Sequence, residues 1–209
     1  MNNDAEDHAE NVDVPHQIGR RAGSESFTNN NAVSRHTLGD FWSWAASDLV
    51  SNTLRGQLAE YIVGMALGCV DGRIRREWDP FDLQTGDGIT VEVKSTAYLQ
   101  SWGTTSPASR RFGIAETIGW HADTNSYGTV AVRAADVYVF CVHTAVDRAT
   151  ADPLRLDQWE FYAVATATID RILGQQKSIA LSRLPGTLGV SSVSFDALGA
   201  AVRSAPTQS

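Results

Sequence analysis

The spacing of hydrophobic residues changes several times along the chain, and each change predicts a different element. In residues 38–50 and 53–67, apolar side chains recur every three to four positions, which is the spacing of amphipathic helices. In residues 78–94 the period falls to two, as expected for strands with one buried face. The first half of the chain therefore predicts two helices followed by a hairpin.

The predicted helices have recognisable ends and faces. Thr37 or Asp40 is expected to cap the first helix, and Gly68 is expected to end the second. The expected core stripe of the second helix consists of Leu54, Leu58, Ile62 and Met65.

Later segments predict a mixture of strands and helices. Residues 134–146 are almost continuously apolar, which is typical of a strand buried on both faces, and residues 158–167 predict a second strand. Short helices are predicted at 168–173 and 194–202, and a short strand at 177–181. This order indicates an α/β domain with a central mixed β-sheet flanked by helices.

The N-terminal segment of the chain differs from the rest in its polar composition. Residues 1–36 are rich in Asn, Asp, Glu and Ser, and their hydrophobic residues follow no regular spacing, so we expect a disordered polar tail before a single domain at 37–204.

No apolar run approaches the roughly 18 residues of a membrane helix, and no secretory signal is recognisable, so a cytoplasmic protein is expected. Cys69 and Cys141 belong to no CxxC pair and are expected to be packing residues.

Composition and charge narrow the classes of function. Hydrophobic residues make up 43% of the 209 positions, which excludes a wholly disordered chain. The formal net charge of -7 disfavours a protein that holds nucleic acid by bulk positive charge alone. Lys94 and Lys177 are the two lysines, and the other basic residues are arginines, which suit bidentate phosphate contacts. The absence of a glycine-rich phosphate loop argues against NTP hydrolysis.

Three charged residues converge on one face of the predicted hairpin. The turn signal at residues 86–88 sets a register that places Asp82 opposite Glu92, with Lys94 on the same face. Neighbouring carboxylates repel unless a cation neutralises them, and their oxygens suit Mg²⁺ or Mn²⁺. Such a metal would polarise a phosphoryl oxygen, while Lys94 would position or deprotonate the attacking water. The pattern therefore predicts phosphodiester hydrolysis.

The same residues resemble a known signature. Asp82 followed by Glu92-Val93-Lys94 resembles the D…(D/E)xK motif of the PD-(D/E)xK, or restriction-endonuclease-like, nuclease superfamily. The resemblance implies a restriction-endonuclease-like core, with Asp82, Glu92 and the Val93 carbonyl around Mg²⁺ and with Lys94 catalytic. It also implies that Glu60, on the preceding helix, supports the metal site.

One position departs from that signature. The proline that precedes the motif aspartate is missing, because Phe81 stands before Asp82. Asp79, which is followed by a proline, is a rival for the motif aspartate. The expected strand register places its odd-numbered position on the apolar face, which favours Asp82.

Possible substrate contacts lie outside the motif. They are Gln57, Gln100, Arg110 and Arg111. Residues 103–130 are expected to form a long loop near the substrate. Gln100 has a competing interpretation as the polar end of a strand, and exposed arginines commonly have no ligand.

The sequence-based hypothesis is a Mg²⁺-dependent DNA endonuclease in restriction or defence against foreign DNA. Relatives with this resemblance often act as dimers, so a homodimer is one expected arrangement. Four alternatives stay open: a catalytically silent DNA-binding or assembly protein with the nuclease fold, a nuclease acting on RNA, a nuclease acting on branched DNA, and a plain ligand-binding α/β protein. In the last case Glu92 and Lys94 would be the solvated face of a strand.

Overall fold

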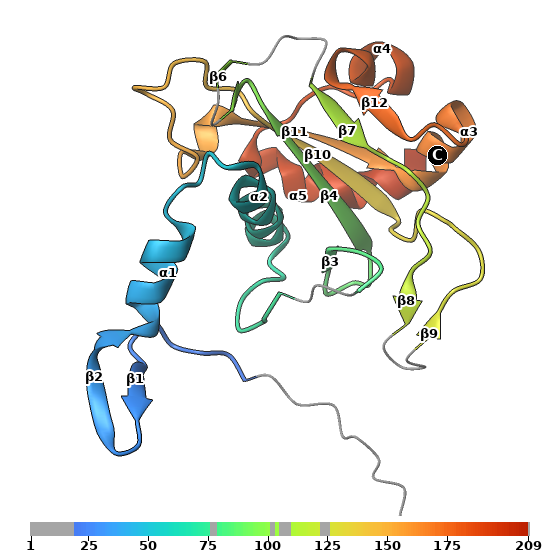
Figure 1. Cartoon of the computed structure of the whole chain (residues 1–209). Helices are drawn as coiled ribbons and strands as arrows, with labels where there is room; N and C mark the ends of the chain where they lie inside the picture. Colours follow the sequence, from blue (N-terminus) through green and yellow to red (C-terminus); the bar gives the residue numbers. More distant parts are fainter. Residues whose placement is uncertain (1–18, 76–78, 101–102, 105–109, 122–125, 209) are drawn as a thin grey trace, which may run out of the picture.

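A computed structural model describes the chain over residues 19–75, 79–100, 103–104, 110–121 and 126–208. A mixed sheet forms its centre, with the strand order β11 (Trp159–Ala165), β10 (Val137–His143), β4 (Thr90–Ala97) and β3 (Leu83–Gln84). β10 runs parallel to β4 and antiparallel to β11, and β3 runs antiparallel to β4. Helices flank this sheet (Figure 1), so the predicted α/β class with a central mixed sheet is confirmed.

Each face of the sheet is covered by its own layer. On one face, α2 (Asn52–Leu67) and α5 (Phe195–Ser204) pack on the inward side chains of the three longer strands. On the other face lie β7 (Arg111–Gly113), β12 (Ser178–Ala180), α3 (Thr166–Leu173) and α4 (Leu184–Leu188). All seven residues of β10 are buried, because this strand is central and covered on both faces, as its continuous apolar sequence predicted.

Shorter elements connect and extend these layers. Antiparallel pairs are formed by β5 (Leu99–Gln100) with β6 (Gly103–Thr104), and by β8 (Trp120–His121) with β9 (Ser126–Tyr127). Short 3-10 turns span Leu156–Gln158, Leu181–Arg183 and Ala205–Gln208. No helix in the described ranges is both long and apolar enough to span a membrane.

An N-terminal arm, residues 19–50, projects away from the sheet (Figure 1). It contains a hairpin of β1 (Ser26–Asn29) and β2 (Ala32–Thr37), followed by α1 (Leu38–Ala46). Thr37 is the N-cap of α1 and forms a capping box with Asp40, so both residues proposed as caps take part.

The hairpin corrects the expectation of an unstructured tail for the part of residues 1–36 that is described. Residues 1–18 lie outside the described ranges. The turn between the two strands places Asn30 at a φ of 52°, which asparagine tolerates better than most residues. Because every residue of β1 is exposed, the hairpin has no apolar face from which sequence reasoning could have found it.

α2 begins and ends as the sequence predicts, but its buried face is partly different. Ser51 caps its first turn, and Gly68 ends it in the left-handed conformation at a φ of 68°. The expected stripe is correct for Ile62 and wrong for Met65, which is 39% exposed. The fully buried apolar positions of the helix are Ala59, Ile62, Val63 and Leu67. The helix is therefore rotated relative to the expected face, since it packs against both β4 and α5.

Two glycines of α2 give a stability prediction with an internal control. A Cβ on Gly64 would lie 2.2 Å from Val70 Cγ1, whereas a Cβ on Gly56 would meet nothing within 4 Å. We expect Gly64→Ala to lower the free energy of unfolding by about 1–3 kcal/mol through overpacking. Gly56→Ala should raise it by roughly 0.5–1 kcal/mol, because alanine favours the helix. Urea unfolding of both variants tests this, and equal effects would contradict the packing at Gly64.

Candidate active site

A cleft of about 530 Å³ opens beside β3 and β4, and acidic and basic side chains meet in it. Asp82, Glu92 and Lys94 line this cleft together. The rest of its lining consists of Asp79, Pro80, Gly113, Ala115, Thr117, Ile118, Gly119, Tyr127, Ala134 and Tyr138. The structure therefore brings the three residues of the predicted motif to one place.

The alternation of β4 gives its side chains two different surroundings. Val91 and Val93 point into the core beneath α2 and α5, so the intervening residues point to the opposite face. There the Lys94 ammonium donates to Glu92 Oε1. The Glu92 and Lys94 side chains are 20% and 34% exposed, so a ligand entering the cleft has access to both.

Asp82 approaches β4 from the chain just before β3. Its backbone N–H donates to the Val91 carbonyl at 3.1 Å, and the Val93 N–H donates to Asp82 Oδ2 at 2.7 Å. Burial, together with the nearby charges of Glu92 and Glu60, raises the pKa of Asp82 to about 6, although the hydrogen bond from Val93 and the charge of Lys94 act in the opposite direction. The predicted proximity of Asp82 and Glu92 thus has an electrostatic cost that a bound cation would offset.

The oxygen donors of this cleft fit Mg²⁺. One carboxylate oxygen each of Asp82 and Glu92 remains outside the hydrogen bonds of the described residues. The Val93 carbonyl points to the same open edge of β4 as its N–H group, because both groups of a strand residue face one side. No group of three or more His, Cys, Asp or Glu side chains in the described ranges is arranged to hold a metal. Mg²⁺ nevertheless commonly binds through one or two carboxylates, with waters and substrate phosphates completing its shell.

Glu60, on α2, is not among the described residues that line the cleft, but its charge acts on Asp82, and it already has a cationic partner. Arg75 donates to both of its oxygens, with Nε–Oε2 at 2.5 Å and Nη2–Oε1 at 3.0 Å. The Glu60 side chain is 15% exposed, and its charge contributes to the raised pKa of Asp82. Glu60 is therefore near the acid pair, as predicted, but its carboxylate is engaged by Arg75. Sequence reasoning could not find this pairing, because the two residues lie fifteen positions apart and no local pattern links them.

The predicted glutamine contacts lie elsewhere. Gln57 is on the exposed face of α2. Gln100 is only 6% exposed, and its side chain accepts from Arg55 Nη1 at 3.1 Å and donates to the Ala97 carbonyl. Neither glutamine is among the described residues that line the cleft.

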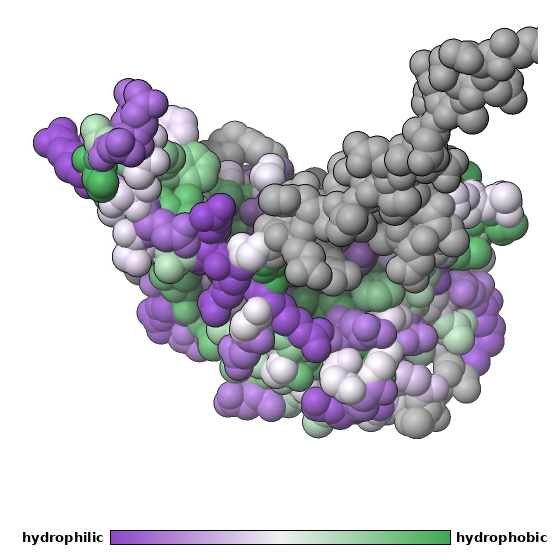
Figure 2. All heavy atoms as spheres, turned by 90° about the horizontal axis from the view of Figure 1, so that it is seen from below, coloured by the Kyte–Doolittle hydropathy of each residue, from purple (hydrophilic) through white to green (hydrophobic). Residues whose placement is uncertain are grey.

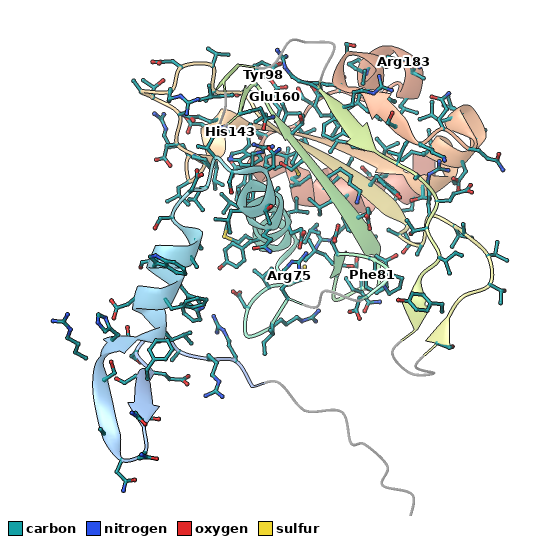
Figure 3. All side chains as sticks on the ribbon, in the orientation of Figure 1. Arg75, Phe81, Tyr98, His143, Glu160 and Arg183 are labelled. Atoms are coloured by element: carbon teal, nitrogen blue, oxygen red, sulfur yellow. The ribbon has the colours of Figure 1, made fainter. Side chains whose placement is uncertain are left out.

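The predicted arginine contacts also lie away from the acids. The Arg110 guanidinium stacks 3.8 Å above the Tyr98 ring, and Arg111 donates to the Ser178 hydroxyl. Figure 3 shows Tyr98 at the end of the sheet opposite to Phe81, the neighbour of Asp82. Part of residues 103–130 does line the cleft, through positions 113, 115, 117–119 and 127.

Of two further cleft residues, Asp79 was expected on the wrong face and Tyr138 was not predicted as part of the site. The expected register placed Asp79 on the apolar face, but it lines the cleft, because β3 begins only at Leu83 and the alternation does not extend back to it. Tyr138 stands beside Glu92 in the parallel register of β10, and burial together with that carboxylate raises its pKa to about 12. The sequence could not predict this position, because a tyrosine within an apolar strand is equally compatible with a purely structural role.

Comparison with known proteins gives one family match. The family described as Bacteriophage T4 endonuclease IV matches residues 33–183 of the chain. The matched span contains α2, all four strands of the central sheet, and every residue that lines the cleft. No curated protein matches the chain.

Proposed function

The chain belongs to the bacteriophage T4 endonuclease IV family, and from this premise we propose that it is a Mg²⁺-dependent endonuclease that hydrolyses DNA in the cleft beside β4. Family membership supports the nuclease activity. The observation that carries the location and the metal is the convergence of Asp82, Glu92 and Lys94 in one cleft inside the matched residues. Convergence of carboxylates with a cationic side chain suits metal-assisted phosphodiester hydrolysis, because the carboxylates can hold a metal and the cation can stabilise developing negative charge.

In the proposed mechanism, Asp82, Glu92 and the Val93 carbonyl would hold Mg²⁺. When bound, the metal would supply Lewis-acid polarisation of the scissile phosphate and activation of the attacking water. The Lys94 ammonium, held by Glu92, orients the attacking water and stabilises the negative charge that develops on the phosphate, and only the neutral amine form of Lys94 could remove the proton of that water. The Tyr138 hydroxyl is protonated at neutral pH, and its raised pKa extends this state to more alkaline pH, so it is a hydrogen-bond donor at the cleft wall.

We also propose that this site is of the PD-(D/E)xK type. Support comes from the placement of the motif on a hairpin next to a parallel pair of strands, with the acid-bearing helix α2 packed against β4. The resemblance further supports a role in restriction or defence against foreign DNA in the cytoplasm. A homodimer, which would present one cleft to each strand of a duplex, stays a prediction.

The test compares substrates. The purified protein is incubated with circular duplex DNA, circular single-stranded DNA, RNA and a four-way junction, each with Mg²⁺, with Mn²⁺ and with EDTA. We expect metal-dependent cutting of circular DNA, which only an endonuclease can open, and no cutting of RNA. Cutting of RNA alone or of the junction alone would support those alternatives instead. DNA binding without cutting would identify a catalytically silent binding protein.

A further inference from the structure

A second cleft lies where the N-terminal arm meets the chain that leads to Arg75. Its volume is about 710 Å³, and its principal side chains are Arg20, Arg21, Trp42 and Arg73. The other described residues that line it are Gly19, Ala22, Gly23 and Ile74, so the lining includes three guanidinium groups and no carboxylate. This local positive charge contrasts with the net charge of -7 of the whole chain.

Contacts with the described residues leave most of the hydrogen-bonding capacity of these arginines unused. Arg21 donates to Glu25 at 2.9 Å, and its side chain is 73% exposed. Arg73 donates a long hydrogen bond, at 3.4 Å, to the Gln84 carbonyl. A guanidinium has five N–H donors, so these contacts orient the groups without saturating them. Trp42, which is 44% exposed, contributes a flat apolar wall.

The second cleft is continuous along the chain with the acid cluster. Ile74 lines the second cleft, and the next residue, Arg75, holds Glu60 beside Asp82. Figure 3 shows Arg75 near the end of the sheet at which Phe81 precedes Asp82. Figure 2 shows hydrophilic residues on the arm and in a band across the middle of the face seen from below. The basic groups of the second cleft are thus followed directly in the sequence by the arginine that holds Glu60.

We propose that the cleft of Arg20, Arg21 and Arg73 binds the phosphate backbone of DNA that flanks the cut site. This inference rests on the proposed function, because it assigns a second part of the surface for the same substrate. Phosphate oxygens are acceptors that guanidinium groups bind bidentately, and such contacts position a nucleic acid without reading its bases. An acidic protein that cuts a polyanion also needs a local positive surface to hold it beside carboxylates.

The test is a DNA-binding titration of two charge-matched triple variants. Arg20→Gln/Arg21→Gln/Arg73→Gln alters the cleft, and Arg155→Gln/Arg171→Gln/Arg183→Gln removes the same charge from exposed positions elsewhere. Figure 3 places Arg183 far from the arm. Binding of a fluorescein-labelled duplex, and of the same labelled single strand, is measured in EDTA over a range of salt concentrations. EDTA separates binding from cutting, and thermal melts confirm that both variants are folded.

We expect the cleft variant to raise Kd at least about tenfold and to make the slope of log K against log salt less negative by about 2.7 for duplex DNA. Its kcat at saturating DNA should equal that of the wild type, and the control triple should bind like the wild type. Equal losses in both triples, an unchanged Kd in the cleft variant, or no DNA binding by the wild type would overturn the inference. If the wild type cuts plasmid DNA while the cleft variant binds normally, this inference fails and the proposed function stands. If the second cleft binds DNA but the wild type never cuts it, the inference stands and the proposed function fails.

Discussion

Replacing Lys94 with alanine is expected to slow single-turnover DNA cleavage by about 10²–10⁴-fold, the range typical of a lost proton-transfer group. The ammonium lies in the cleft and is held by Glu92 on the same strand face. Its removal leaves the acid pair in place but removes the cation that serves the attacking water and the developing phosphate charge. DNA binding in EDTA should change little, because one phosphate contact accounts for a small share of the affinity.

Lys177→Ala is the matched control, because Lys177 is the other lysine of the chain and is exposed before β12. It should cleave at the wild-type rate. Similar activity in the Lys94 and Lys177 variants would remove Lys94 from the chemistry. A loss of folding in Lys94→Ala would be visible by circular dichroism, and Lys94→Arg then keeps the positive charge while testing whether an amine is required.

Asp82→Asn is expected to abolish metal-dependent cleavage and, in EDTA, to stabilise the protein. The amide oxygen can still accept the Val93 N–H, but the group no longer carries a charge that burial and two neighbouring carboxylates oppose. A folded-state pKa of about 6, above the ordinary 3.8, means that the favourable contribution of protonated Asp82 is complete below the ordinary pKa and is lost as pH rises through 6. The variant should therefore gain stability over the wild type at pH 8 and little at pH 4.

The measurement is the melting temperature of both proteins in EDTA at pH 4 and pH 8, with plasmid cleavage in Mg²⁺ alongside. Each kcal/mol of stabilisation corresponds to about 2–4 °C for a chain of this size. Asp87→Asn is the control, because the Thr85 hydrogen bond lowers the pKa of Asp87, so neutralising it should not stabilise the fold. A lower melting temperature for Asp82→Asn at pH 8, with cleavage intact, would contradict both roles assigned to Asp82.

Local patterns were sufficient to predict the central part of the site. The turn at residues 86–88 joins β3 to β4, and Leu83 pairs with Val91 as the sequence register requires. Because side chains alternate along a strand, that register places Glu92 and Lys94 on one face. The long apolar run of β10 likewise predicted a strand buried on both faces.

The features that sequence reasoning missed depend on where regular structure ends. Asp79 lies before β3, where the chain bends, so extending the two-residue alternation of the strand back to Asp79 predicted the wrong face for its side chain. Gln100 belongs to the separate strand β5 after a bend at Tyr98, so the alternation of β4 does not reach it. A period can predict side-chain direction only while the element that produces it continues.

Buried polar contacts between distant segments were also beyond prediction. Arg55 is 4% exposed on α2, although an arginine in a helix is usually expected at the surface. Its donors are accepted by the Val50 carbonyl, Asn52 and Gln100, the last of which is brought close only by the packing of β5 near α2. The same holds for Arg75 and Glu60, whose pairing depends on the path of the chain after α2.

The most direct test of the central claim is the cleavage of a supercoiled plasmid by the wild type and by Glu92→Gln over a range of Mg²⁺ concentrations. The substitution keeps the size of the side chain but removes the charge of one proposed metal ligand. We predict that the wild type nicks and linearises the plasmid with Mg²⁺ and not with EDTA, and that Glu92→Gln does neither at any Mg²⁺ concentration. Cleavage by the wild type in EDTA, or equal cleavage by Glu92→Gln, would contradict the assignment of Asp82 and Glu92 as the metal-binding pair.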